Sequence, residues 1–71
     1  MVYDYRKLRG KIKEIYGTQD IFAEKLGIGR VSLSKRLTSQ LEFSQTEIKK
    51  SCELLNIDPE DVSKYFFTPE V

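Results

Sequence analysis

Histidine is absent from this sequence of 71 residues, and Cys52 is its only cysteine. A single cysteine cannot form a disulfide bond within the chain, and without histidine it cannot complete a structural zinc site. Long apolar runs are missing too, since none approaches the roughly 18 residues that cross a bilayer. We therefore expect a soluble protein without metal, cofactor or membrane span, whose fold rests on side-chain packing.

Side-chain arrangements that carry out catalysis are also absent. The sequence has no serine paired with a base and no phosphate-cradling glycine loop before a helix. Asp58, Glu60 and Asp61 lie together, but capping and the helix dipole explain acidic residues at the start of a helix. We expect no catalytic residues and no enzymatic activity.

Length and the N-terminal residues bear on organisation and location. A chain of 71 residues forms a core that is barely large enough, so residues 1–71 are expected to fold as one domain. Stabilisation by a homodimer is an open alternative. The segment MVYDYRKLRG lacks the apolar stretch and the small-residue cleavage site of a signal peptide, so we expect a cytoplasmic protein.

Charge is unevenly distributed along the chain, although the formal net charge is only +1. Residues 1–40 contain nine Lys or Arg and four Asp or Glu, whereas residues 41–71 contain three and seven. A basic first half fits a surface that meets nucleic acid, and the acidic second half would then face away from it. The overall charge is low for a protein whose affinity comes from neutralising phosphates.

Apolar spacing and helix-boundary residues predict an all-α fold of five helices. The predicted helices cover residues 4–16, 19–26, 30–37, 45–55 and 59–66. Asp4, Ser44 and Asp58 are the expected N-caps of the first, fourth and fifth helices. Glu47 can complete a capping box with Ser44, and Pro59 suits the first position of a helix.

Two of these helices have a clear apolar side that predicts their core contacts. The expected core residues of the first helix are Tyr5, Leu8, Ile12 and Ile15. Those of the fourth helix are Ile48, Cys52 and Leu55.

Residues 18–37 form two short predicted helices joined by a glycine turn, a unit typical of DNA-binding proteins. Thr18 is the expected cap of the first helix, and Gly27 can end it in a left-handed conformation. In the second helix, Leu33 and Leu37 define the inward direction. At 100° per residue, Val31 and Lys35 then lie on the opposite side, with Ser32 and Ser34 beside them.

The stretch TQDIFAEKLGIGRVSLSKRL resembles the helix-turn-helix of the phage repressor and Cro superfamily. The resemblance implies a compact five-helix helix-turn-helix domain, with the helix-turn-helix at residues 18–37. Gln19 stands at the family position that hydrogen-bonds a phosphate beside a helix N-terminus. The sequence departs from the pattern at Gly29, where a capping serine or threonine is common, and at Arg36, where Leu37 takes over the second aliphatic contact.

The longer stretch SLSKRLTSQLEFSQTEIKKSCELLNIDPEDVSKYF resembles the modulators of repression of temperate lactococcal phages. These short phage regulators oppose a resident repressor in the choice between lysis and lysogeny. The resemblance implies a phage repressor protein as the partner.

The sequence leaves two functions open. In the first, the helix-turn-helix face binds the repressor protein and lifts repression by occlusion. The apolar residues expected to anchor this contact are Ile28, Val31, Leu41 and Phe43. In the alternative, the third helix docks in the major groove of double-stranded operator DNA, as in Cro. The residues expected to contact DNA or the partner are Gln19, Arg30, Val31, Ser32, Ser34, Lys35 and Arg36.

Overall fold

A computed structural model of the protein describes residues 3–69. Within this range the chain forms five α-helices and one short 3₁₀-helix, so the predicted all-α class is confirmed. The helices are α1 (Arg6–Tyr16), α2 (Gln19–Leu26), α3 (Arg30–Leu37), α4 (Gln45–Leu55) and α5 (Val62–Phe66), and the 3₁₀-helix Pro59–Asp61 precedes α5. Each helix within this range is too short or too polar to cross a lipid bilayer.

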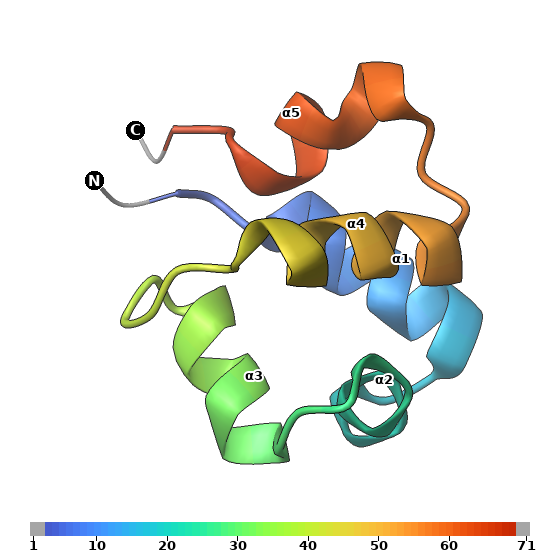
Figure 1. The fold of residues 1–71 in the computed structure, drawn as a ribbon, viewed down its shortest axis with the longest axis vertical. Helices are drawn as coiled ribbons and strands as arrows, with labels where there is room; N and C mark the ends of the chain where they lie inside the picture. Colours follow the sequence, from blue (N-terminus) through green and yellow to red (C-terminus); the bar gives the residue numbers. More distant parts are fainter. Residues whose placement is uncertain (1–2, 70–71) are drawn as a thin grey trace.

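The helices are arranged along the longest axis of the molecule (Figure 1). Helices α1 and α4 occupy the middle, α5 lies at one end, and α2 and α3 lie at the other. The first and last described segments run side by side, because the Asp4 N–H donates to the Thr68 carbonyl over 2.7 Å. The α2–α3 end is thus separated from α5 by the central pair.

The core draws on all five α-helices and on the connection that follows α4. Its buried apolar side chains are Tyr5, Leu8, Ile12, Phe22, Ala23, Leu26, Leu33, Leu37, Leu55, Ile57 and Phe66. No single helix of eight residues could be stable alone in water, so contacts with this shared core hold α2 and α3 in helical form.

The predicted boundaries of α2 and the predicted cap of α4 are confirmed. Thr18 Oγ1 accepts the Ile21 N–H over 3.3 Å, and Gly27 ends α2 with a φ of 87°. The Gly27 and Ile28 N–H groups both bond back to the Ala23 carbonyl, which is a glycine-terminated helix end. At α4, Ser44 and Glu47 form the predicted capping box.

The start and the inward side of α1 differ from the prediction. Asp4 does accept the Arg6 N–H over 2.9 Å, but the helix begins at Arg6 because the Asp4 backbone pairs with the C-terminal segment instead. Ile15, predicted to be in the core, is 39% exposed. Tyr16 packs against the core in its place, and its hydroxyl donates to the Leu54 carbonyl over 3.2 Å.

The inward side of α4 is rotated relative to the prediction. Leu55 is buried as expected, but Ile48 and Cys52 are only partly buried. Ser51, which was not predicted, is completely buried, and its Oγ has no hydrogen-bond partner among residues 3–69. A small side chain at this position lets α4 approach the other helices closely.

The fifth predicted helix is divided into two pieces. Its first turn, Pro59–Asp61, is a 3₁₀-helix, and α5 begins only at Val62. Asp58 occupies the predicted N-cap position before Pro59, but its side chain makes no cap hydrogen bond. The backbone carbonyl of Asp58 accepts the Asp61 N–H over 2.8 Å, which closes the tighter turn.

Candidate partner-binding surface

Helix α3 is held from its inner side and at both ends. Leu33 and Leu37 are 0% and 3% exposed, as the inward direction predicted from the sequence requires. Gly29 caps its start in an extended conformation without a side-chain hydrogen bond. Past its end, Ser39 has a φ of 64° and the Gln40 N–H bonds back to the Lys35 carbonyl over 2.8 Å. The helix is thereby fixed in length and direction.

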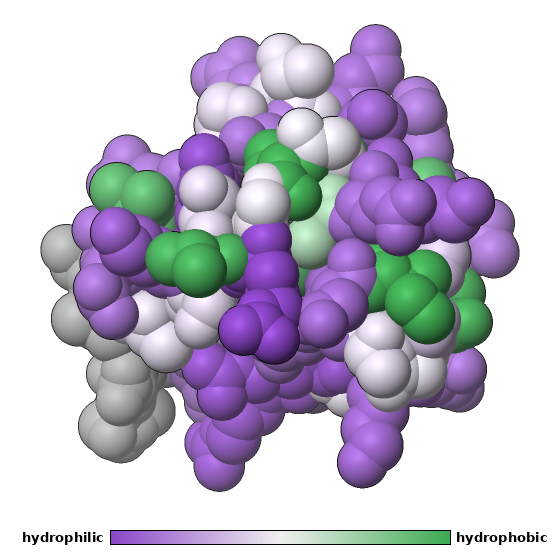
Figure 2. All heavy atoms as spheres, turned by 90° about the horizontal axis from the view of Figure 1, so that it is seen from below, coloured by the Kyte–Doolittle hydropathy of each residue, from purple (hydrophilic) through white to green (hydrophobic). Residues whose placement is uncertain are grey.

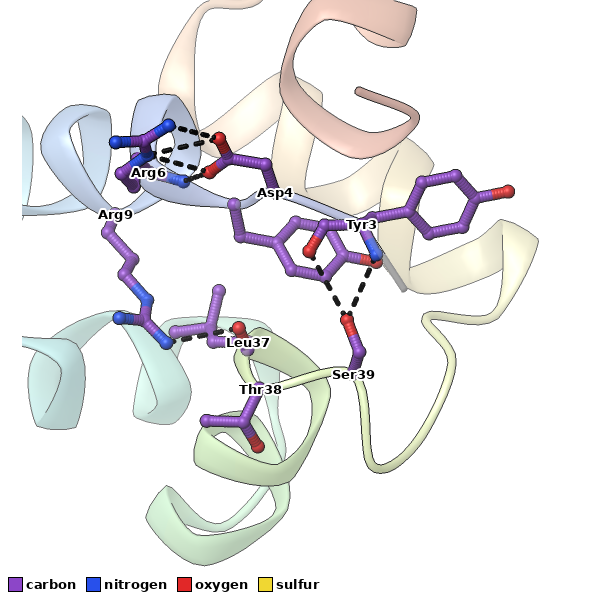
Figure 3. Close-up of a pocket in the computed structure, with 8 residues that line it drawn as sticks. Tyr3, Asp4, Arg6, Arg9, Leu37, Thr38 and Ser39 are labelled. Atoms are coloured by element: carbon purple, nitrogen blue, oxygen red, sulfur yellow. Dashed lines mark hydrogen bonds and ion pairs between the residues drawn. The ribbon is translucent and has the colours of Figure 1, made fainter. Parts of the chain in front are cut away.

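The N-terminal segment and α1 form hydrogen bonds with the C-terminal end of α3 (Figure 3). Ser39 Oγ accepts the Tyr3 N–H over 3.2 Å and donates to the Tyr3 carbonyl over 3.3 Å. From α1, Arg9 Nη2 donates to the Leu37 carbonyl over 3.1 Å. The residues that make these bonds line an open hollow of about 570 Å³ between the start of α1 and the end of α3. Its polar groups bond largely to one another, which gives the hollow a structural role.

Asp4 and Arg6 lie on the rim of this hollow (Figure 3). Arg6 Nη2 is 2.8 Å from Asp4 Oδ2, and the hydrogen bonds from Arg6 hold the pKa of the Asp4 carboxyl below its usual value. The pair is exposed to solvent on the Arg6 side. It therefore contributes little to stability by itself.

The outward side of α3 is open to solvent. We call Arg30, Val31, Ser34 and Lys35 the α3 outer face, because all four are exposed. Val31 is 62% exposed, the highest value among the large exposed apolar side chains of residues 3–69. Ser32 is only partly buried and lies at the edge of this face.

Figure 2 shows the molecule from the end where α2 and α3 lie. Apolar side chains appear there as separate patches, with hydrophilic side chains between them. The surface is thus mixed in character, with no continuous apolar area.

Arg36 is set apart from the outer face. Its Nε and Nη2 donate to the two carboxylate oxygens of Glu47 over 2.9 and 3.2 Å, and its Nη1 donates to the Ser32 carbonyl over 2.9 Å. Both side chains of this ion pair are 17% exposed. Arg36, predicted to contact DNA or the partner, links α3 to the first turn of α4 in this structure.

The same contacts shift the acidity of Glu47. Burial by itself raises the pKa of this carboxyl, but the hydrogen bonds from the Ser44 backbone and from Arg36 outweigh burial and lower the pKa below 4.5. Glu47 is thus charged at neutral pH and serves the capping box and the ion pair together.

Helix α2 contributes a charged group beside the outer face. Asp20 Oδ2 lies 3.6 Å from Arg30 Nη1, and the two side chains are 61% and 68% exposed. Gln19, predicted to contact phosphate, is partly buried at the first position of α2. Asp20 was missed from the sequence, where an acid in the first turn of α2 is explained by the helix dipole alone.

The four predicted apolar anchors separate into two kinds. Leu41 is 45% exposed and Val31 projects from α3, so both can be reached by a partner. Ile28 and Phe43 are partly buried against the core. Phe43 lies between the rings of Tyr5 and Phe66, with centroid distances of 5.6 and 5.2 Å, so it closes the core instead of projecting as an anchor.

Sequence reasoning missed one exposed apolar residue on α2. Ile21 is 43% exposed and adjoins Asp20 in the chain. The apolar spacing of Phe22, Ala23 and Leu26 could have revealed it, because these buried residues leave Ile21 on the outer side of the helix.

A second hollow lies between α4 and α5, away from the outer face. Its apolar lining includes Ile48, Cys52, Ile57, Val62 and Phe67. Burial raises the pKa of the Cys52 thiol, with a smaller contribution from Glu53, so the cysteine stays protonated at neutral pH. A protonated thiol is a poor nucleophile, which fits a packing role for Cys52.

Together these features define a small all-helical protein that presents one face of a firmly held helix. The chain belongs to the family described as "Protein of unknown function (DUF739)", whose sequence profile matches residues 1–69. It is also similar to the modulator of repression (MOR) of the temperate bacteriophage TP901-1 from Lactococcus lactis, known from its solution structure. The two chains are 39% identical with a TM-score of 0.82, and the alignment covers 100% of this chain and 96% of that chain. Among curated proteins, no match is found.

This similarity bears on the resemblances drawn from the sequence. Similarity to a modulator of repression of a lactococcal phage is confirmed in both sequence and fold. Membership of the phage repressor and Cro superfamily stays a prediction.

Proposed function

We propose that this protein is a phage regulator of the lysis-lysogeny switch that binds the resident repressor protein through the α3 outer face. It acts without catalysis or cofactor, in the cytoplasm of the bacterial host, and lifts repression by occluding the surface that the repressor uses. Its structural relative is a modulator of repression, which supports the regulatory role.

The exposure of Val31 is the observation that supports a protein partner. A β-branched aliphatic side chain that is 62% exposed gains nothing from water. Buried in an interface, a side chain of this size contributes about 1.5 to 3 kcal/mol. Apolar residues surrounded by polar ones are typical of the centre of a protein interface.

The charges around Val31 also favour protein over DNA. Of the three cations on α3, Arg36 is bound to Glu47 and Arg30 is paired with Asp20. Lys35, the third cation of α3, takes part in neither of these two ion pairs. Since DNA affinity comes chiefly from cations that neutralise phosphates, this face is poorly equipped to bind DNA.

The test is a binding measurement with the purified repressor of the same phage. Wild-type protein is expected to bind, and Val31→Asp to raise Kd by about 100-fold, because it places a charge at the centre of the contact. Ser63→Asp is the matched control, since it adds the same charge at an exposed position of α5, which lies at the opposite end of the molecule (Figure 1). Equal binding by both variants, or none by the wild type, would contradict the proposal.

A second candidate function is operator binding with α3 in the major groove. It is supported by exposed Ser34 and Lys35, which can hydrogen-bond bases or phosphates, and by the basic residues of the first half of the chain. A gel shift of operator DNA at nanomolar protein that weakens steeply with salt would favour this function. A shift only in the presence of repressor would indicate a joint complex.

A further inference from the structure

The ion pair between Asp20 of α2 and Arg30 of α3 bears on whether the α3 outer face binds DNA or a protein. Asp20 lies in the first turn of α2, and Arg30 is the first residue of α3. Their charged atoms are 3.6 Å apart, although both side chains are well exposed. Neither side chain is forced into this position by burial, so the pair alters the charge of the surface without fixing the fold.

A docked DNA duplex would bring phosphates to this place. A helix that enters the major groove has a sugar-phosphate backbone on each side of it, because the groove is about 12 Å wide. Asp20 Oδ2 lies 3.6 Å from Arg30 Nη1, so a phosphate that Arg30 contacts would lie beside this carboxylate. The start of α2 would otherwise suit a phosphate, since its free N–H groups and helix dipole attract anions.

Asp20 opposes DNA in two ways. Its charge would repel a phosphate at the start of α2, and its ion pair with Arg30 would compete with a phosphate for that guanidinium group. With Arg36 held by Glu47, two of the three α3 cations are then withdrawn from DNA.

We propose that Asp20 is a specificity-determining residue, which excludes DNA from the α3 outer face and reserves this face for a protein. The identity of that protein as the repressor rests on the proposed function, whereas the exclusion of DNA is a property of this chain alone. The two claims can therefore be tested separately.

The experiment measures binding to a 30-base-pair DNA duplex by fluorescence anisotropy at low and moderate salt. The Asp20→Asn variant keeps the size of the side chain and removes its charge. Asp58→Asn is the matched control, because it makes the same chemical change at an exposed acid in the connection between α4 and α5. Circular dichroism checks that both variants keep the helical content of the wild type.

We expect Asp20→Asn to bind the duplex about tenfold more tightly than the wild type at low salt. The steepness of its salt dependence should increase by about one phosphate contact. Asp58→Asn should stay within about threefold of the wild type, since long-range charge effects are screened. Adding Arg30→Gln to Asp20→Asn should abolish the gain, because Arg30 is the cation that is released.

Equal DNA affinity of the Asp20→Asn and Asp58→Asn variants would overturn the inference, and so would tight DNA binding by the wild type. Neither result depends on the repressor. Failure of the wild type to bind repressor would contradict the proposed function alone, and the duplex comparison would still decide the role of Asp20.

Discussion

The two sides of α3 serve different purposes in the same eight residues. On the inner side, Leu33 and Leu37 are buried and Arg36 is bound to Glu47 of α4. On the outer side, the side chains of Arg30, Val31, Ser34 and Lys35 are exposed to solvent. The inner side therefore sets where the helix lies, while the outer side determines what it can bind. The two properties should therefore respond to different substitutions.

The largest expected effect is on the inner side. Leu33→Ala removes a completely buried side chain and leaves a cavity, so it should lower the free energy of unfolding by about 3 kcal/mol. For a domain of this size that lowers Tm by more than about 10 °C. Thermal unfolding followed by circular dichroism measures the change. A loss below about 1 kcal/mol would mean that Leu33 does not hold α3.

The next effect tests the bond between α3 and α4. Glu47→Gln should cost about 1.5 to 3 kcal/mol at pH 7, because it removes the charge that Arg36 and the Ser44 backbone bind. The pKa of Glu47 is lowered in the folded state, so its contribution is complete above about pH 4.5 and is lost as pH falls through the lower folded value.

Unfolding measured at pH 7 and near pH 3 checks this dependence on pH. The advantage of the wild type over Glu47→Gln should shrink in acid, and the difference between the two proteins isolates Glu47 from Asp4, whose pKa is also lowered. An advantage that is the same at both pH values would show that the charge of Glu47 is not what binds α4 to α3.

A smaller effect of opposite sign is expected on the inner side of α4. Ser51→Ala removes a buried hydroxyl without a hydrogen-bond partner among the described residues, and alanine also favours the helix. The free energy of unfolding should rise by about 1 kcal/mol. The control Ser63→Ala, at an exposed position of α5, should change the free energy of unfolding by less than about 0.5 kcal/mol. If Ser51→Ala destabilises the protein, its hydroxyl has a partner such as water.

The smallest effect on stability is expected on the outer side of α3. Val31→Ala should change the free energy of unfolding by no more than about 0.5 kcal/mol, because Val31 is largely exposed. Under the proposed function the same variant should bind repressor about tenfold more weakly. Chemical denaturation and a binding titration on one preparation measure both values. A large loss of stability would show that the outer side of α3 also holds the fold together, which would contradict the proposed difference between the two sides.

Local sequence signals predicted many of the helix boundaries and caps. The bounds of α3, the Thr18 cap, the stop at Gly27 and the Ser44–Glu47 capping box all depend on residues a few positions apart. Such interactions are encoded in spacing, so a single sequence suffices to find them. The exposure of Val31 and Lys35 follows equally from the angular period of a helix.

Other features depended on partners distant in the chain. Ile15 and Tyr16 exchange expected roles because the Tyr16 hydroxyl reaches the Leu54 carbonyl, 38 positions away. The sequence predicts Arg36 as a binding residue from its charge and its position on α3. The structure pairs it with Glu47, which lies 11 positions later in the chain. Spacing cannot reveal contacts of this kind.

The sequence by itself determined that the chain is helical, where most helices begin and end, and which side of α3 turns inward. These outcomes follow from backbone hydrogen bonding and from the helical repeat, which act over a few residues. Only the tertiary structure decided which cations of α3 remain available, because that depends on how α2 and α4 bring Asp20 and Glu47 alongside it. Charge pairing acts through space, and the packing of the whole domain sets those distances.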